Sequence, residues 1–121
     1  MTNDKPSIRL RVMFGGKAML GPGKADLLEQ IRQTGSISAA GKRMGMSYKR
    51  AWMLVETLNT IFKEPLVESS RGGSSGGGTR LTQTGEIVVK QYRKLEAKAS
   101  VAGRQEIANL QELLLDISSR K

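Results

Sequence analysis

The sequence predicts a mainly α-helical fold with small β-hairpins, and three observations support this prediction. Apolar residues recur at spacings of three and four along much of residues 24–117, as on the buried face of a helix. Short β-prone segments stand on both sides of the glycines at residues 15–16 and 72–78. Serines precede two of the helical segments, where a hydroxyl can accept an unpaired backbone N–H.

The charge of the chain points to a polyanionic partner. A chain of 121 residues suffices for one domain, and its 20 Lys and Arg against 11 Asp and Glu give a formal net charge of +9. This balance favours nucleic acid first and an anionic membrane second. Residues 1–81 hold 13 of the cations and 6 of the anions, so the excess lies in the first two thirds. The alternative is a basic surface that only confers solubility.

Several classes of site have no support in the sequence. Cysteine and histidine are both absent, which removes thiolate nucleophiles, imidazole bases and the usual zinc ligands. No Gly-Lys pair has the spacing of a phosphate-binding loop, and no apolar run approaches the ~20 residues of a membrane span. We therefore expect no enzyme, no catalytic or metal-binding residue and no membrane contact, and we expect a cytoplasmic, nucleoid-associated protein.

The first elements are a hairpin and a helix. Apolar residues alternate from Ile8 to Phe14, which predicts a half-buried strand. Gly15-Gly16 permits a tight turn into a second strand over residues 17–20. Residues 21–23 then break the chain, and a helix follows over about residues 24–34.

Residues 35–52 predict two helices joined by a tight turn. Ser36 is positioned to cap the first helix, and Ser47 to cap the second. Gly45 can supply the positive φ that ends the first helix. The second helix is expected to reach about Lys63, with Trp52 packed at the flank of its buried face. This is the anatomy of a helix-turn-helix, whose second helix lies in the DNA major groove.

We predict DNA contacts from the cations and polar side chains of this motif and of the segment that follows. Lys49 or Arg50 is suited to a guanine edge, and Tyr48 to a phosphate or a thymine methyl. The other cations suit phosphate contacts. The alternative is a solvated helix face. The candidate DNA-binding residues are Lys42, Arg43, Ser47, Tyr48, Lys49, Arg50, Arg71 and Arg80.

A second hairpin is predicted directly after the motif. Residues 66–70 and 79–81 read as short strands, and between them lies a glycine-serine run. Such runs are usually flexible linkers. The position of this one, inside a domain and next to a recognition helix, favours the wing of a winged helix-turn-helix. The glycines assigned to the wing are Gly72, Gly73, Gly76, Gly77 and Gly78.

The C-terminal part predicts two helices. Thr84 is the expected cap of a long helix, and Gly103 interrupts its apolar pattern, so a kink or break is expected there. The apolar stripes can pack back onto their own domain or form a dimer interface. The candidate interface residues are Val88, Tyr92, Leu95, Ile107, Leu110, Leu114 and Ile117. The predicted organisation is a flexible tail over residues 1–7, a winged helix-turn-helix domain over residues 8–83 and a dimerisation segment over residues 84–121.

From Gly35 onward the sequence resembles the N-terminal DNA-binding domain of ModE-type, molybdate-responsive regulators with a LysR-like helix-turn-helix. The resemblance rests on GSIS at residues 35–38, MSYKRAW at 46–52, LVE at 66–68, GGSSGGG at 72–78 and LTQTG at 81–85. It implies a winged helix-turn-helix that binds double-stranded DNA as a homodimer, through helices after the wing. It also implies regulation of genes for molybdenum or metal uptake.

The resemblance does not extend to molybdate binding. Family members that sense molybdate bind it in additional C-terminal domains, and residues up to Lys121 contain no strand-rich second half. We therefore expect no cofactor in this chain, whether it is a single-domain member or a part of a longer protein. Two other readings stay open: an architectural DNA-binding protein without sequence preference, and a winged protein-interaction module.

Overall fold

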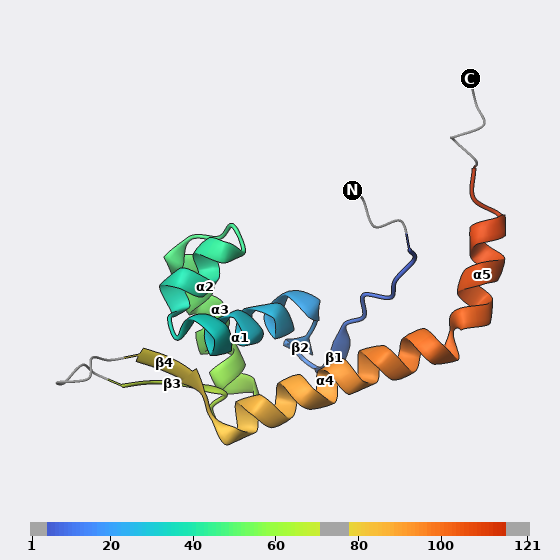
Figure 1. The fold of residues 1–121 in the computed structure, drawn as a ribbon. Helices are drawn as coiled ribbons and strands as arrows, with labels where there is room; N and C mark the ends of the chain where they lie inside the picture. The colour runs from blue at the N-terminus through green and yellow to red at the C-terminus, as the bar shows by residue number, and fades with distance from the viewer. Residues whose placement is uncertain (1–4, 71–77, 116–121) are drawn as a thin grey trace.

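The computed structural model describes residues 5–70 and 78–115, and it is mainly helical with two antiparallel hairpins in that part of the chain. Figure 1 shows a helical body, with one hairpin extending from it and a long helix running past it. This arrangement confirms the predicted fold class. The elements are β1 (Val12–Gly15), β2 (Ala18–Leu20), α1 (Pro22–Thr34), α2 (Ile37–Arg43), α3 (Tyr48–Ile61), β3 (Val67–Ser70), β4 (Gly78–Leu81), α4 (Gln83–Ala102) and α5 (Arg104–Glu112).

The first hairpin is shorter than predicted. Strand β1 begins at Val12, not Ile8, because its partner β2 ends at Leu20 and offers no residue to pair with the earlier ones. Ile8 keeps the predicted half-buried position, but Phe14 is 55% exposed. The turn uses the predicted glycines, and both Gly15 and Gly16 have positive φ.

Helix α1 begins earlier than predicted. Pro22 occupies its first turn, where a proline removes no intrahelical hydrogen bond, so residues 21–23 start the helix instead of separating it from the hairpin. Leu27, Leu28 and Ile31 are fully buried, as their spacing predicts. The helix ends at Gly35, whose φ is 70°.

The core lies where α1, α3 and the strand region meet. Leu58 of α3 and Leu66 before β3 are fully buried with the three apolar residues of α1. Trp52 does not join them: it is 45% exposed, so the prediction that it packs at the flank of the core is wrong. The buried face of α3 is formed by Ala51, Val55 and Leu58, and the small Ala51 lies where α3 approaches Gly41 of α2.

Helix α4 is anchored at its start. Its cap is Thr82, not the predicted Thr84: the Thr82 hydroxyl accepts from the Gly85 N–H at 3.0 Å and donates to the Pro65 carbonyl at 2.7 Å. Gly85 lies so close to the chain before β3 that an added Cβ would stand 2.2 Å from the Leu66 carbonyl oxygen. The Thr82 N–H also donates to that oxygen, at 2.9 Å.

Helix α5 leaves the body at the predicted break. Gly103 lies between α4 and α5, and Figure 1 shows α5 turning away from the line of α4. No residue of α5 is buried, and Leu110 and Leu114 are 62% and 70% exposed. Ile117, the last predicted interface residue, lies outside the described residues.

Candidate nucleic-acid interface

The predicted helix-turn-helix is formed by α2 and α3, with both predicted caps in place. The Ser36 hydroxyl accepts from the Ala39 N–H at 3.0 Å, and the Ser47 hydroxyl accepts from the Arg50 N–H at 3.1 Å. Gly45 has a φ of 71° in the turn between the helices. At Gly41 an added Cβ would stand 2.9 Å from the Ala51 Cβ, so a glycine permits the close approach of α2 and α3.

The first turn of α3 presents its side chains to solvent. Ser47, Tyr48, Lys49 and Arg50 are all exposed, and Tyr48 exposes 56% of its surface despite its large ring. The Ser47 hydroxyl is engaged in capping, so its first role is to hold this turn. Three side chains are therefore available at the start of α3: one aromatic ring and two cations.

The cations at the end of α2 differ in their surroundings. Lys42 and Arg43 are both exposed in the last turn of the helix. Arg43 donates to the side-chain oxygens of Gln30 and Gln33 on α1, at 3.3 and 3.4 Å. These are long bonds between neutral acceptors and an exposed guanidinium, so they hold Arg43 only weakly in place.

The β3–β4 hairpin is attached to the helix-turn-helix by a backbone hydrogen bond. The Thr79 N–H donates to the carbonyl of Gly35, the residue that joins α1 to α2, at 2.9 Å. A hollow of about 690 Å³ lies at this junction and is lined from Thr34, Gly35 and both strands. This geometry places the hairpin beside the motif, as a wing requires.

Only part of the predicted wing is described. Gly78 opens β4 opposite Ser70, whereas Arg71, Gly72, Gly73, Gly76 and Gly77 lie outside the described residues. Arg80 stands opposite Glu68 in the register and forms an ion pair with it at 2.8 Å, although 80% of the Arg80 side chain is exposed. A phosphate would therefore have to compete with the Glu68 carboxylate for the Arg80 guanidinium.

Two further cations lie next to the motif and were missed by the sequence analysis. Arg11 and Lys24 line, with Arg50 and Met46, a hollow of about 270 Å³ at the start of α1. Lys24 donates to the Met19 carbonyl at 3.0 Å, and burial, followed by repulsion from Arg11, lowers the pKa of Lys24. No local pattern could reveal this group, because its members come from the segment before β1, from α1 and from α3.

The predicted dimer residues that the structure describes fall into three groups by their exposure. Tyr92 is 2% exposed, and its hydroxyl donates to the Leu10 carbonyl at 2.6 Å, so it belongs to the interior of its own chain and its assignment to an open interface is wrong. Val88 and Ile107 are half-buried. Leu95 remains exposed on α4, as do Leu110 on α5 and Leu114 just after α5.

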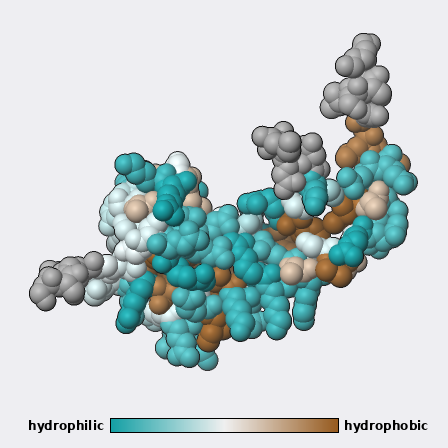
Figure 2. Space-filling model, viewed as in Figure 1, coloured by the Kyte–Doolittle hydropathy of each residue, from teal (hydrophilic) through white to brown (hydrophobic). Residues whose placement is uncertain are grey.

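An apolar groove adjoins the exposed residues of α4. Phe14 of the first hairpin and Phe62 after α3 meet edge to face, with ring centres 6.1 Å apart. With Ile87 and Leu95 they line a groove of about 240 Å³. Figure 2 shows further hydrophobic surface along α4 and on α5.

The described residues form neither a metal site nor a membrane-spanning helix. Within residues 5–70 and 78–115, no three acidic, histidine or cysteine side chains are grouped as a metal site would require. Among the same residues, no helix combines the length and the apolar character that crossing a membrane demands.

Comparison with known proteins identifies relatives over most of the chain. ModE, a transcriptional regulator of Yersinia pestis, is 41% identical over 100 residues, which cover 80% of this chain and 38% of ModE. The molybdenum-pterin-binding protein MopA of Rhodobacter capsulatus is 38% identical over 101 residues, which cover 83% of this chain and 38% of MopA. The chain thus spans well under half the length of these two relatives.

Solved structures with the same fold include a complex of the CbnR DNA-binding domain with DNA. It has a TM-score of 0.57 at 20% identity and covers 73% of this chain and 95% of that chain. LysG of Corynebacterium glutamicum, with bound effector arginine, has a TM-score of 0.54 at 24% identity over 77% of this chain and 30% of that chain. Residues 24–86 match the family model of bacterial regulatory helix-turn-helix proteins of the lysR family. The chain therefore belongs to the lysR family of bacterial regulatory helix-turn-helix proteins.

Proposed function

We propose that this chain is the DNA-binding part of a dimeric, sequence-specific transcriptional regulator of genes for molybdenum uptake or use. The observation that carries the proposal is the capped first turn of α3, which exposes Tyr48, Lys49 and Arg50 beside a hairpin attached to the same motif. The molybdenum assignment follows from the relatives, several of which are named ModE.

Base recognition is assigned to the first turn of α3. Arg50 or Lys49 donates to guanine O6 and N7 in the major groove, and Tyr48 contacts a phosphate or a thymine methyl. A recognition helix reads bases with its N-terminal residues, which is where these side chains stand. Ser47 keeps the turn in shape by capping it.

Phosphate contacts are assigned to the cations around this turn. Lys42 and Arg43 end α2, and Arg11 and Lys24 share a hollow with Arg50. Arg80 joins them by exchanging its ion pair with Glu68 for a phosphate, which the exposure of its side chain allows. Arg71 is assigned the same role from the sequence alone. Such contacts fix orientation and contribute the salt-dependent part of affinity.

Dimerisation is assigned to the exposed apolar residues of α4 and α5. A nine-residue helix with no buried side chain, such as α5, is marginal in water without a partner. A second copy supplies that partner and covers Leu95, Leu110 and Leu114 together with the groove at Phe14 and Phe62. Two-fold pairing also places two recognition helices on one face, to match a palindromic operator.

No catalytic or molybdate-binding role is assigned to the described residues. We place the chain in the cytoplasm, where a regulator meets the nucleoid. In this proposal any molybdate response of a longer protein arises outside residues 5–115.

Selection of binding sites from random duplexes tests the proposal. The expected result is an enriched pair of inverted half-sites about one helical turn apart. Binding without any enriched sequence would instead support an architectural protein, in which the same cations act without base recognition. No binding even at low salt would point to a protein-interaction module and would contradict the proposal.

A further inference from the structure

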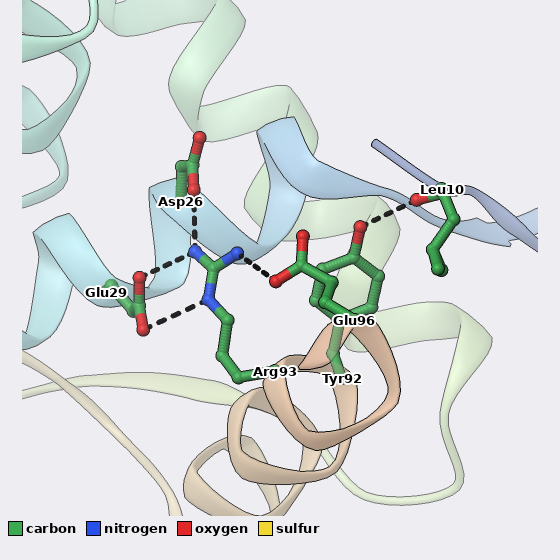
Figure 3. Close-up of polar contacts among 6 residues, drawn as sticks. All are labelled: Leu10, Asp26, Glu29, Tyr92, Arg93 and Glu96. Atoms are coloured by element: carbon green, nitrogen blue, oxygen red, sulfur yellow. Dashed lines mark hydrogen bonds and ion pairs between the residues drawn. The ribbon is translucent and has the colours of Figure 1, made fainter. Parts of the chain in front are cut away.

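The most heavily paired cation among the described residues lies outside the candidate DNA surface, between α1 and α4. The Arg93 guanidinium of α4 contacts three carboxylates, as Figure 3 shows. It donates to Asp26 at 2.6 Å and to both oxygens of Glu29 at 2.6 and 3.2 Å. It also donates to Glu96, one turn further along α4, at 2.9 Å. We call these four residues the Arg93 cluster.

The cluster also adjoins the segment before the first hairpin. The Arg93 guanidinium carbon stands 5.7 Å from the centre of the Tyr92 ring, within range of a cation–π interaction. The Tyr92 hydroxyl donates to the Leu10 carbonyl, and Figure 3 shows Tyr92 beside Arg93, with its hydroxyl directed at Leu10. Two consecutive residues of α4 therefore reach α1 on one side and the N-terminal segment on the other.

The chemistry of the cluster requires an arginine. A guanidinium carries five N–H donors in a rigid plane, so it can engage several carboxylates at once and fix their relative positions. A lysine ammonium is a mobile point charge without that plane. The hydrogen bonds that the guanidinium donates to Glu29, Asp26 and Glu96 raise the pKa of Arg93 despite its partial burial, so the cation persists throughout the working pH range.

The position of Arg93 lets the cluster influence where the C-terminal end of α4 lies. Helix α4 is anchored at its start by Gly85 and Thr82, and Arg93 lies near its middle. From Arg93 to Ala102 the helix extends about 14 Å further, and α5 follows. A small change of tilt at Arg93 therefore displaces Leu110 and Leu114, which carry the proposed dimer contact.

We propose that Arg93 is a positioning residue that sets the angle between α1 and α4, and thereby the distance between the two recognition helices of a dimer. This inference rests on the proposed function for its consequence on DNA. Loss of the guanidinium leaves three carboxylates facing one another across α1 and α4. Their repulsion pushes the helices apart, so a cluster that holds α1 and α4 together becomes one that separates them.

Distances between spin labels test the angle without DNA. Because the chain has no cysteine, Gln33→Cys on α1 and Lys98→Cys on α4 give two labelled sites, both exposed in the structure. Labelled chain diluted into excess unlabelled chain reports the intrachain distance. We expect one narrow distribution with Arg93 present, and a longer, broader one in the Arg93→Met variant.

Two variants serve as comparisons. Arg32 of α1 also pairs with a carboxylate of α4, Glu86, at 3.1 Å, but this pair is exposed and lies one turn after the anchored start of α4. Arg32→Met should therefore leave the distribution unchanged. Arg93→Lys keeps the charge and should give a distance distribution of intermediate width. If Arg93→Met does not fold, Arg93→Lys is measured in its place. A narrow, unshifted distribution in the variant that folds would overturn the inference.

Binding to paired half-sites tests the consequence for DNA. The selected half-sites are placed at spacings that differ by single base pairs, and affinity is measured for each. We expect Arg93→Met to reduce the preference for the best spacing over its neighbours by roughly threefold or more, with affinity for a single half-site unchanged. An unchanged spacing preference with only a lower Tm would show that the cluster merely stabilises the chain. Failure of the unaltered protein to bind any duplex would contradict the proposed function instead, and the label distances would still decide the role of Arg93.

Discussion

At the scale of single residues, the clearest contribution of the structure is to separate side chains that shape the interface from those that face it. Ser47 was a candidate DNA contact from its position. Its hydroxyl accepts from the Arg50 N–H, so it first fixes the turn on which Tyr48, Lys49 and Arg50 stand. Arg80 faces the wing surface but is paired with Glu68.

Replacement of Ser47 by alanine should lower the free energy of unfolding by about 1 kcal/mol, because the Arg50 N–H loses its acceptor. Ser36→Ala, the matched cap of α2, should cost a similar amount. Urea denaturation of both variants measures the effect. If Ser47→Ala weakened DNA binding with no change in stability, the hydroxyl would act on DNA directly.

Replacement of Arg50 by alanine should cost roughly 1–3 kcal/mol of binding free energy on the preferred duplex and relax one base position. Arg80→Ala should weaken binding to all sequences about equally, because a phosphate contact carries no base information. Competition binding against duplexes with single substitutions distinguishes the two effects. Equal losses on every sequence for Arg50→Ala would remove it from base recognition.

At the scale of elements, the sequence predicts a helix end or a turn well where the interaction that determines it joins residues close together in the sequence. The Ser36 and Ser47 caps join residues three apart, and Gly45 needs only its own positive φ. The cap of α4 was misplaced by two residues because two threonines compete. The choice of Thr82 depends on its bond to Pro65, which lies 17 residues earlier.

Interactions between distant elements could not be predicted. The partners of Arg93 on α1 lie 64 and 67 residues away. The hollow lined by Arg11, Lys24 and Arg50 is formed by the segment before β1, by α1 and by α3. Tyr92 has the spacing of the other apolar residues of α4. That spacing cannot show whether an apolar face packs against its own chain or against a second copy. Trp52 follows the buried Ala51 on α3 but is 45% exposed, and its place beside the buried face did not show how much of the ring the rest of the fold would cover.

The anchoring of α4 gives a prediction at this scale. Gly85→Ala should destabilise the chain by about 3 kcal/mol, because the new Cβ would collide with the Leu66 backbone and one of the two segments would have to shift. Gly23→Ala in the first turn of α1 is the matched control, since nothing lies within 4 Å of its Cβ position. It should be neutral or stabilise by about 0.5 kcal/mol. Thermal unfolding of both variants checks the difference, and a tolerated Gly85→Ala would mean that α4 is not fixed at its start.

At the scale of the whole molecule, two exposed surfaces stand apart. Exposed cations surround the first turn of α3, and four exposed leucines, Leu110, Leu113, Leu114 and Leu115, lie in α5 or directly after it. Each surface therefore predicts a different kind of association.

Binding to DNA should depend steeply on salt. Neutralisation of six phosphates gives a slope of about −5 for the logarithm of the affinity against that of the salt concentration. Titrations with the selected duplex at several salt concentrations measure the slope. Binding that stays flat from low to moderate salt would contradict a phosphate-based interface.

Introduction of charge at the exposed leucines of α5 and of the residues after it should produce monomers. In the Leu110→Glu, Leu114→Glu variant, two carboxylates would have to be buried in the proposed interface, so sedimentation should show single chains that bind half-sites weakly. Gln105→Glu with Asn109→Glu places the same charges on the polar face of α5 and should leave the dimer intact. An unaltered protein that sediments as a monomer would contradict the assignment.

Molybdate should not bind to this chain by calorimetry, because oxyanion capture is assigned to domains outside these residues. A micromolar site on the intact chain would overturn that assignment.

The close approach of α2 and α3 at Gly41 has a consequence for any large-scale mutational survey of this protein. Because even a methyl group there would stand 2.9 Å from the Ala51 Cβ, every substitution at Gly41 should separate the two helices and abolish reporter activity. By activity alone, variants at Gly41 would look the same as variants at Arg50, although the buried Gly41 is not in a position to contact a base. A parallel score of protein abundance would separate them: variants at Gly41 should be depleted in both, and variants at Arg50 in activity only.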